Sequence, residues 1–62
     1  MKQNDMAGRL HLSLMSSKVE QLKEAAEWLR VHSEEFPAVN RNAKRILASV
    51  AMLQINLGAD EA

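Results

Sequence analysis

A chain of 62 residues without a single cysteine has few ways to complete a hydrophobic core. A domain of this size buries only about 60% of the surface that its unfolded chain exposes, so disulfides, a metal or a second subunit usually supplement the core. The absence of cysteine excludes disulfides and thiolate metal sites. The two histidines, His11 and His32, lack the short spacing of paired zinc ligands. We therefore expect a homodimer without a metal or a cofactor.

The composition is typical of a small helical protein. Hydrophobic residues make up 47% of the chain, but Trp28 and Phe36 are its only aromatic residues, as in bundles with aliphatic cores. No stretch reaches the roughly 18 uninterrupted apolar residues that a membrane-spanning helix needs. The polar start is followed by no apolar signal core, which predicts an unexported, cytoplasmic protein without a membrane partner.

Charge is distributed unevenly, although the formal net charge is zero. Residues 16–35 hold five acidic and three basic side chains, whereas residues 36–59 hold three basic side chains and no acidic one. Local charge governs binding more than the sum does. The basic stretch around Arg41, Lys44 and Arg45 is therefore a candidate for binding an anion.

Residues 9–14 read Arg-Leu-His-Leu-Ser-Leu, in which polar and apolar side chains alternate. This period of two predicts a short β-strand. One face would carry Leu10, Leu12 and Leu14, and the other would carry Arg9, His11 and Ser13. Leucine is a mediocre strand former, and an alternative stays open in which a longer helix starts near Arg9. That helix would have a heptad-like seam of Leu12, Met15, Val19, Leu22, Ala26 and Leu29.

Two helices are expected after the alternating segment. Ser17, followed three residues later by Glu20, has the form of a capping box and predicts a helix over residues 18–34. Pro37 ends that helix, because it disfavours helical geometry in the residue before it. Asn40 or Asn42 can cap a second helix that ends at Gly58.

The second helix is apolar nearly all round between residues 46 and 57, which predicts that a partner subunit covers it. The expected organisation is a flexible N-terminus over residues 1–8, a single strand-helix-helix domain over residues 9–58 and an acidic tail over residues 59–62.

With a short strand followed by two helices, the chain resembles the ribbon-helix-helix family of DNA-binding proteins, most closely over residues 9–26 and more loosely beyond. The match rests on the alternating segment and on the spacing of Ser17, Val19, Glu20, Leu22 and Ala26. The resemblance implies a mainly α, intertwined homodimer whose paired strands enter the major groove, and hence a sequence-specific transcriptional repressor that binds double-stranded DNA.

The resemblance also implies the roles of individual residues. Base edges would be read by Arg9, His11 and Ser13. Phosphates would be bound near the start of the second helix by Asn40, Arg41, Asn42, Lys44 and Arg45. The dimer core would consist of Leu10, Leu12, Leu14, Val19, Leu22, Leu29, Ile46, Leu47, Val50 and Leu53.

Two other functions stay open. One is an all-α helical hairpin that forms a dimeric four-helix bundle and acts as a protein- or RNA-binding adaptor with no DNA role. The other is an antitoxin that represses its own operon. The sequence contains no recognisable catalytic triad, glycine-rich phosphate loop or metal-ligand motif, so we expect no enzyme.

Overall fold

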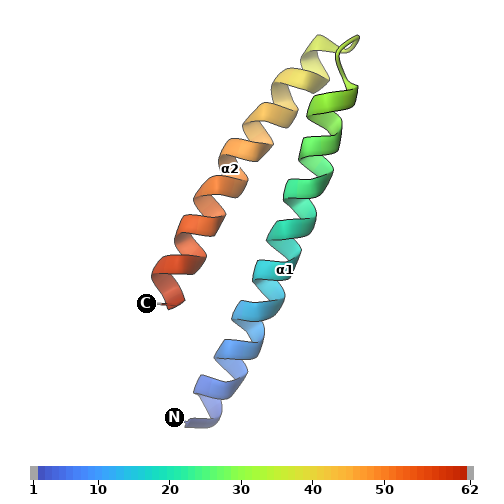
Figure 1. Cartoon of the computed structure of the whole chain (residues 1–62). Coiled ribbons are helices and arrows are strands. Elements are labelled where there is room, and N and C mark those ends of the chain that lie inside the picture. Colours follow the sequence, from blue (N-terminus) through green and yellow to red (C-terminus); the bar gives the residue numbers. More distant parts are fainter. Residues whose placement is uncertain (1, 62) are drawn as a thin grey trace.

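The protein is a hairpin of two long α-helices, seen in a computed structural model that describes the backbone of residues 2–61 and the side chains of residues 8–58 (Figure 1). Helix α1 spans Lys2–His32 and helix α2 spans Pro37–Glu61. The helices run in opposite directions and are joined by residues 33–36. The described residues contain no strand. The expectation of a mainly α fold is confirmed, and the helical-hairpin alternative fits.

The predicted strand over residues 9–14 is wrong, because these residues lie inside α1. Residues 2–18 contain no proline and no β-branched residue, and they are rich in leucine, methionine, lysine and other good helix formers. Their leucine pattern also fits a helix, because residues four positions apart, such as Leu10 and Leu14, share one helical face. A ribbon of paired strands cannot form from these residues in this conformation.

The ends of α1 also differ from those predicted. The helix continues through Ser17 and Glu20, so these residues do not cap a helix start. It also continues through the expected domain boundary between residues 8 and 9, and it ends at His32 rather than at residue 34. The longer helix with a heptad-like seam is therefore the alternative that describes α1.

Helix α2 begins at Pro37, three residues before the earlier of its two predicted caps. Proline suits the first helical position, because an amide hydrogen there would have no partner within the helix. The carbonyl oxygen of Phe36 accepts the first helical hydrogen bond from the backbone nitrogen of Asn40, at 2.9 Å. Gly58 lies inside α2, and the described residues include no glycine with a positive φ, so its predicted role as a helix stop is wrong.

The two helices meet along a seam of small side chains spaced seven residues apart. The buried apolar residues are Val19 and Ala26 on α1 and Ala43 and Val50 on α2. A seven-residue repeat keeps the contacting side chains on the facing sides of two helices over several turns. Ala43 is 1% exposed, so the helix backbones approach closely at this level. Among the side chains that the structure describes, no large one is fully buried.

The resulting molecule is a rod rather than a globule. Its principal extents are 52 × 16 × 11 Å and its radius of gyration is 14.9 Å, whereas a globular domain of this length has a radius of gyration of about 11 Å. Helix α1 has 31 residues and α2 has 25, so the N-terminal end of α1 projects past the end of α2 (Figure 1). Most side chains therefore lie on the surface.

Candidate interaction surfaces

The three residues predicted to read DNA bases do not form one edge. Arg9, His11 and Ser13 are all exposed on α1. Successive residues of an α-helix are rotated by about 100°. Arg9 and Ser13 therefore share one side of the helix, while His11 lies on the opposite side. The common outward face that a strand would give these residues is therefore absent.

Of the residues predicted to bind phosphate, Asn40 has a different role. Its side-chain amide donates hydrogen bonds to the carbonyl oxygen of Arg30 at 2.7 Å and to Oγ of Ser33 at 3.3 Å. Asn40 is half-buried, and it links the start of α2 to the end of α1. The other four predicted residues are exposed over the first turns of α2: Arg41, Asn42, Lys44 and Arg45.

The ten residues predicted for the dimer core fall into three groups. The seam between α1 and α2 contains buried Val19 and Val50 and half-buried Leu12 and Leu47. The outer side of α1 carries Leu10 and Leu14, both exposed. The remaining four are exposed beside the seam: Leu22, Leu29, Ile46 and Leu53. Leu10 and Leu14 therefore do not share a face with Leu12, as they would in a strand, and the last four residues belong to an exposed face of the hairpin.

An apolar face follows one side of the whole hairpin. It consists of Met15, Leu22 and Leu29 on α1 and Val39, Ile46 and Leu53 on α2. Leu22 lies three positions after Val19 of the seam, and Ile46 lies three positions after Ala43. A residue three positions after a seam residue lies about 60° from it around the helix axis, and therefore beside the contact between the helices. Because the helices are antiparallel and face each other, the same offset falls on the same side of both.

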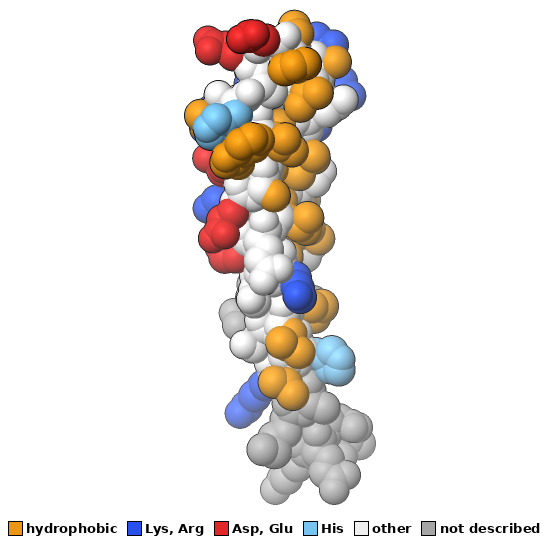
Figure 2. Space-filling view, turned by 90° about the vertical axis from the view of Figure 1, so that its right-hand side faces the viewer, with side chains coloured by type: hydrophobic (Ala, Val, Ile, Leu, Met, Phe, Trp, Pro, Cys, Tyr) orange, Lys and Arg blue, Asp and Glu red, His pale blue; other side chains and the backbone are white. Residues whose placement is uncertain are grey.

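The six side chains of this apolar face are all accessible to solvent, and Leu22 is 49% exposed. All six of these side chains are uncharged. Seen from the side, hydrophobic side chains run along one long edge of the molecule, whereas acidic side chains gather along the opposite edge (Figure 2). Continuous exposed apolar surface of this kind is unusual in a monomeric protein, so this face is a candidate interaction site.

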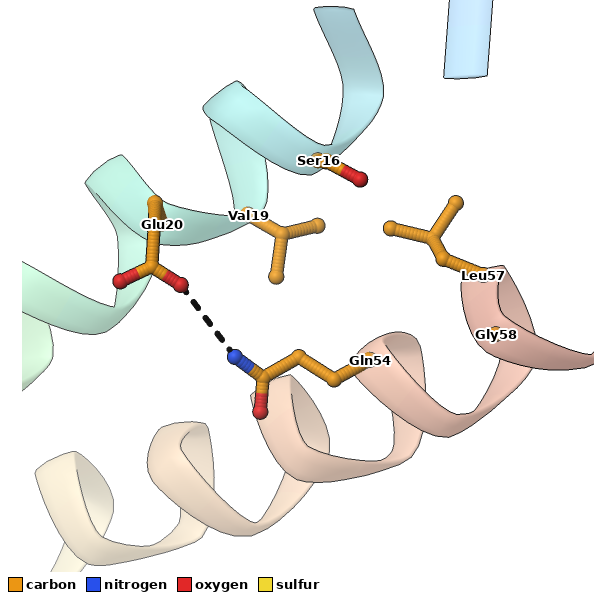
Figure 3. A pocket seen from close by; sticks show the side chains of 6 residues that line it. All are labelled: Ser16, Val19, Glu20, Gln54, Leu57 and Gly58. Atoms are coloured by element: carbon orange, nitrogen blue, oxygen red, sulfur yellow. Dashed lines mark hydrogen bonds between the residues drawn. The ribbon is translucent and has the colours of Figure 1, made fainter. Parts of the chain in front are cut away.

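The opposite side of the hairpin is polar. Nε2 of Gln54 donates a hydrogen bond to a carboxylate oxygen of Glu20 across the two helices, at 3.4 Å (Figure 3). Beside this pair lies a small hollow of about 240 Å³, lined by Ser16, Val19, Glu20, Gln54, Leu57 and Gly58 (Figure 3). The apolar side chains of Val19 and Leu57 point toward each other across the hollow (Figure 3). Among its lining residues, Glu20 alone has an ionisable side chain.

A second hollow lies on α1 alone, on the side away from the apolar face. It is a shallow groove of about 370 Å³ lined by Glu20, Lys23, Glu24, Glu27, Trp28, Val31 and His32. Trp28 is 60% exposed there, although it is the one tryptophan of the chain. The sequence indicated nothing of this groove, because Trp28 stands outside the repeating apolar pattern of α1.

The described residues contain no group of three or more histidine, aspartate or glutamate side chains placed to hold a metal ion. Within the same residues, neither helix combines the length and the hydrophobicity that crossing a membrane requires. Comparisons of the chain with protein-family models, with curated proteins and with solved structures found no match. The main exposed features of the described residues are the apolar face, the groove and the basic start of α2.

Proposed function

We propose that this protein is a non-enzymatic adaptor that acts as a homodimer. Two hairpins pair through their apolar faces and form a four-helix bundle, a fold in which antiparallel helices enclose a core of residues in heptad spacing. The observation that carries the proposal is the line of six exposed apolar side chains along one side of both helices.

The exposed area supports pairing. The hairpin exposes 5240 Å², whereas a globular monomer of the same mass exposes about 4,000 Å². If each chain buries the excess of about 1,200 Å² against its partner, the interface covers about 2,400 Å² in total, which lies within the range of obligate homodimers. Pairing would thus bring the accessible surface of each chain close to that of an ordinary folded protein.

A second copy of the chain suits the apolar face better than an unrelated partner does. The six side chains of the face carry no charge that would select a complementary sequence, and both of its helices carry large aliphatic side chains at the same seven-residue spacing. A twofold axis through the face can therefore bring similar stripes together and let them interdigitate. The net charge is zero, so two copies do not repel each other over long distances.

The dimer has a clear functional consequence. Surfaces outside the apolar face occur twice in the bundle, including the groove at Trp28 and the basic start of α2. A protein with two identical sites on a rigid scaffold can hold two partner molecules, or bind one repetitive partner with increased avidity. Bivalent binding of this kind is what we mean by an adaptor.

A pair of isoleucine substitutions tests the proposed pairing. Ile46 belongs to the apolar face, whereas Ile55 lies on the outer side of α2 and is 62% exposed. Ile46→Glu introduces a charge into the proposed interface twice, so we expect the dimer dissociation constant to rise by about 100-fold or more. Ile55→Glu makes the same chemical change and should leave the dissociation constant nearly unchanged.

Thermal unfolding followed by circular dichroism provides the measurement. The melting temperature of a dimer rises with protein concentration, because dissociation is coupled to unfolding. We expect this dependence in the unmodified chain and in Ile55→Glu, and a lower melting temperature in Ile46→Glu. A melting temperature of the unmodified chain that does not change over a wide concentration range would reject the proposal, even if Ile46→Glu failed to fold.

A second candidate function is the binding of nucleic-acid phosphates. It is favoured by three exposed basic side chains at the start of α2, Arg41, Lys44 and Arg45, in a stretch that has no acidic residue between positions 36 and 59. These side chains project away from the apolar face, so a dimer would present two such clusters. Neighbouring basic side chains on one helix bind the backbone of RNA or DNA without reading its sequence.

Fluorescence anisotropy with labelled RNA and DNA duplexes tests this second function. Arg41→Glu should weaken binding to every sequence alike and reduce the salt dependence of the affinity. Lys18→Glu, the same kind of change on α1, is the control. Equal weakening by the two substitutions would show that binding depends on the overall charge of the protein and not on the basic cluster, and would contradict this second function.

A further inference from the structure

The groove on α1 combines exposed apolar side chains with acidic ones. Its large apolar side chains are those of Trp28 and Val31, and Val31 is 58% exposed. Three carboxylates and one ammonium group line the groove, namely those of Glu20, Glu24, Glu27 and Lys23. The lining therefore carries a net negative charge beside exposed apolar side chains.

The orientation of Trp28 is held by its neighbour one turn later. The rings of Trp28 and His32 stack with centroids 4.2 Å apart and planes inclined by 15°. Nδ1 of His32 also donates a hydrogen bond to the carbonyl oxygen of Trp28, at 2.8 Å, which fixes the imidazole in place. One face of the indole is thus covered, yet most of the side chain stays accessible. A large aromatic side chain held in this way is ordered before a ligand arrives, which lowers the entropic cost of binding.

The three carboxylates are not equally engaged. Glu27 pairs with Arg30 at 3.4 Å, and Glu20 accepts the hydrogen bond from Gln54. Glu24 makes no hydrogen bond or ion pair within the part of the chain that the structure describes. Glu24 is therefore the carboxylate best able to pair with a cation of a ligand lying over Trp28.

We propose that this groove binds a basic amphipathic helix of a partner protein. Apolar side chains of that helix would cover Trp28 and Val31, and an arginine or lysine would pair with Glu24 and lie against the indole, which attracts cations through its π-electrons. The acidic lining excludes nucleic acids and acidic segments by repulsion. The inference rests on the proposed adaptor function and names the chemistry of the partner. The groove and the apolar face lie on different sides of α1, so a partner in the groove does not compete with the dimer.

The single tryptophan makes the test direct. A synthetic amphipathic helix of leucine and arginine is titrated against the full chain while the fluorescence of Trp28 is recorded, and the same peptide with glutamate in place of arginine is the control ligand. We expect a saturable change in emission with the basic peptide and none with the acidic one. Glu24→Lys should weaken the affinity by about fivefold or more, because attraction becomes repulsion.

Glu34→Lys, outside the groove in the turn between the helices, makes the same change in net charge and should leave the affinity within about twofold of the unmodified value. Equal weakening by both substitutions, or no change in Trp28 emission, would overturn the inference. If the peptide bound to the apolar face instead, neither substitution would change its affinity, and the inference would be overturned as well. Sedimentation equilibrium of the Glu24→Lys variant separates this inference from the proposed dimer, because loss of the groove should leave the dimer mass unchanged.

Discussion

The side-chain amide of Asn40 lies 2.7 Å from the carbonyl oxygen of Arg30 and donates a hydrogen bond to it. The carbonyl groups in the last turn of a helix have no partner within that helix, so Asn40 of α2 satisfies one that α1 leaves open. A second bond from the same amide reaches Oγ of Ser33, which is buried in the turn. Asn40 thereby sets the geometry of the hairpin at its closed end.

Replacing this asparagine should destabilise the hairpin. For Asn40→Ala we expect a loss of about 1 kcal/mol in the free energy of unfolding relative to Asn42→Ala, because an intramolecular hydrogen bond contributes about 0.5–1.5 kcal/mol. Asn42 is exposed on the same helix, so both variants gain the same helix propensity and the difference isolates the hydrogen bonds. Urea denaturation gives both free energies. Equal values for the two variants would show that the contact with Arg30 is not stabilising.

The close approach of the helices at Ala43 gives a second prediction. Ala43 is almost fully buried in the seam, so the larger side chain in Ala43→Leu must push α1 and α2 apart. We expect a loss of about 1–3 kcal/mol in the free energy of unfolding. Ala48→Leu, at an exposed position of α2, should change it by less than about 0.5 kcal/mol. An Ala43→Leu variant as stable as Ala48→Leu would contradict the packing of the seam.

Gly58 gives a prediction of the opposite sign. Glycine inside a helix costs about 0.5–1 kcal/mol relative to alanine. Gly58 has no positive φ, and a Cβ atom built on it would meet nothing within 4 Å. Gly58→Ala should therefore raise the melting temperature measured by circular dichroism. A lower melting temperature would mean that Gly58 ends α2 in a left-handed conformation, as a helix-stop glycine does.

Part of this fold could be predicted from local patterns. The break at Pro37 and the apolar repeat from Val19 to Leu29 indicated two helices, because proline and a spacing of three to four residues act through local geometry. The segment over residues 9–14 misled because alternating leucines satisfy both a strand and a helix over so short a distance. The longer run of helix formers around the segment determines that residues 9–14 are helical. The six residues alone cannot show which of the two structures forms.

The interaction surfaces depended more on tertiary structure. The spacing of Leu22 to Leu29 and of Ile46 to Leu53 was visible in the sequence, but which apolar side chains pair within the chain became apparent only once the two helices were placed together. The role of Asn40 depends on a carbonyl group ten positions earlier, which no local pattern reveals. The groove at Trp28 likewise could not be predicted, because the side chains that line it follow no sequence repeat. It was recognisable only once the fold showed which of them are exposed.

Sedimentation equilibrium of the unmodified chain at micromolar concentration tests the pairing of the apolar faces most directly. The proposal predicts a molar mass of twice the 6.9 kDa of one chain. A single species at 6.9 kDa that remains folded by circular dichroism would contradict it, because the hairpin would then be stable with its apolar face in water.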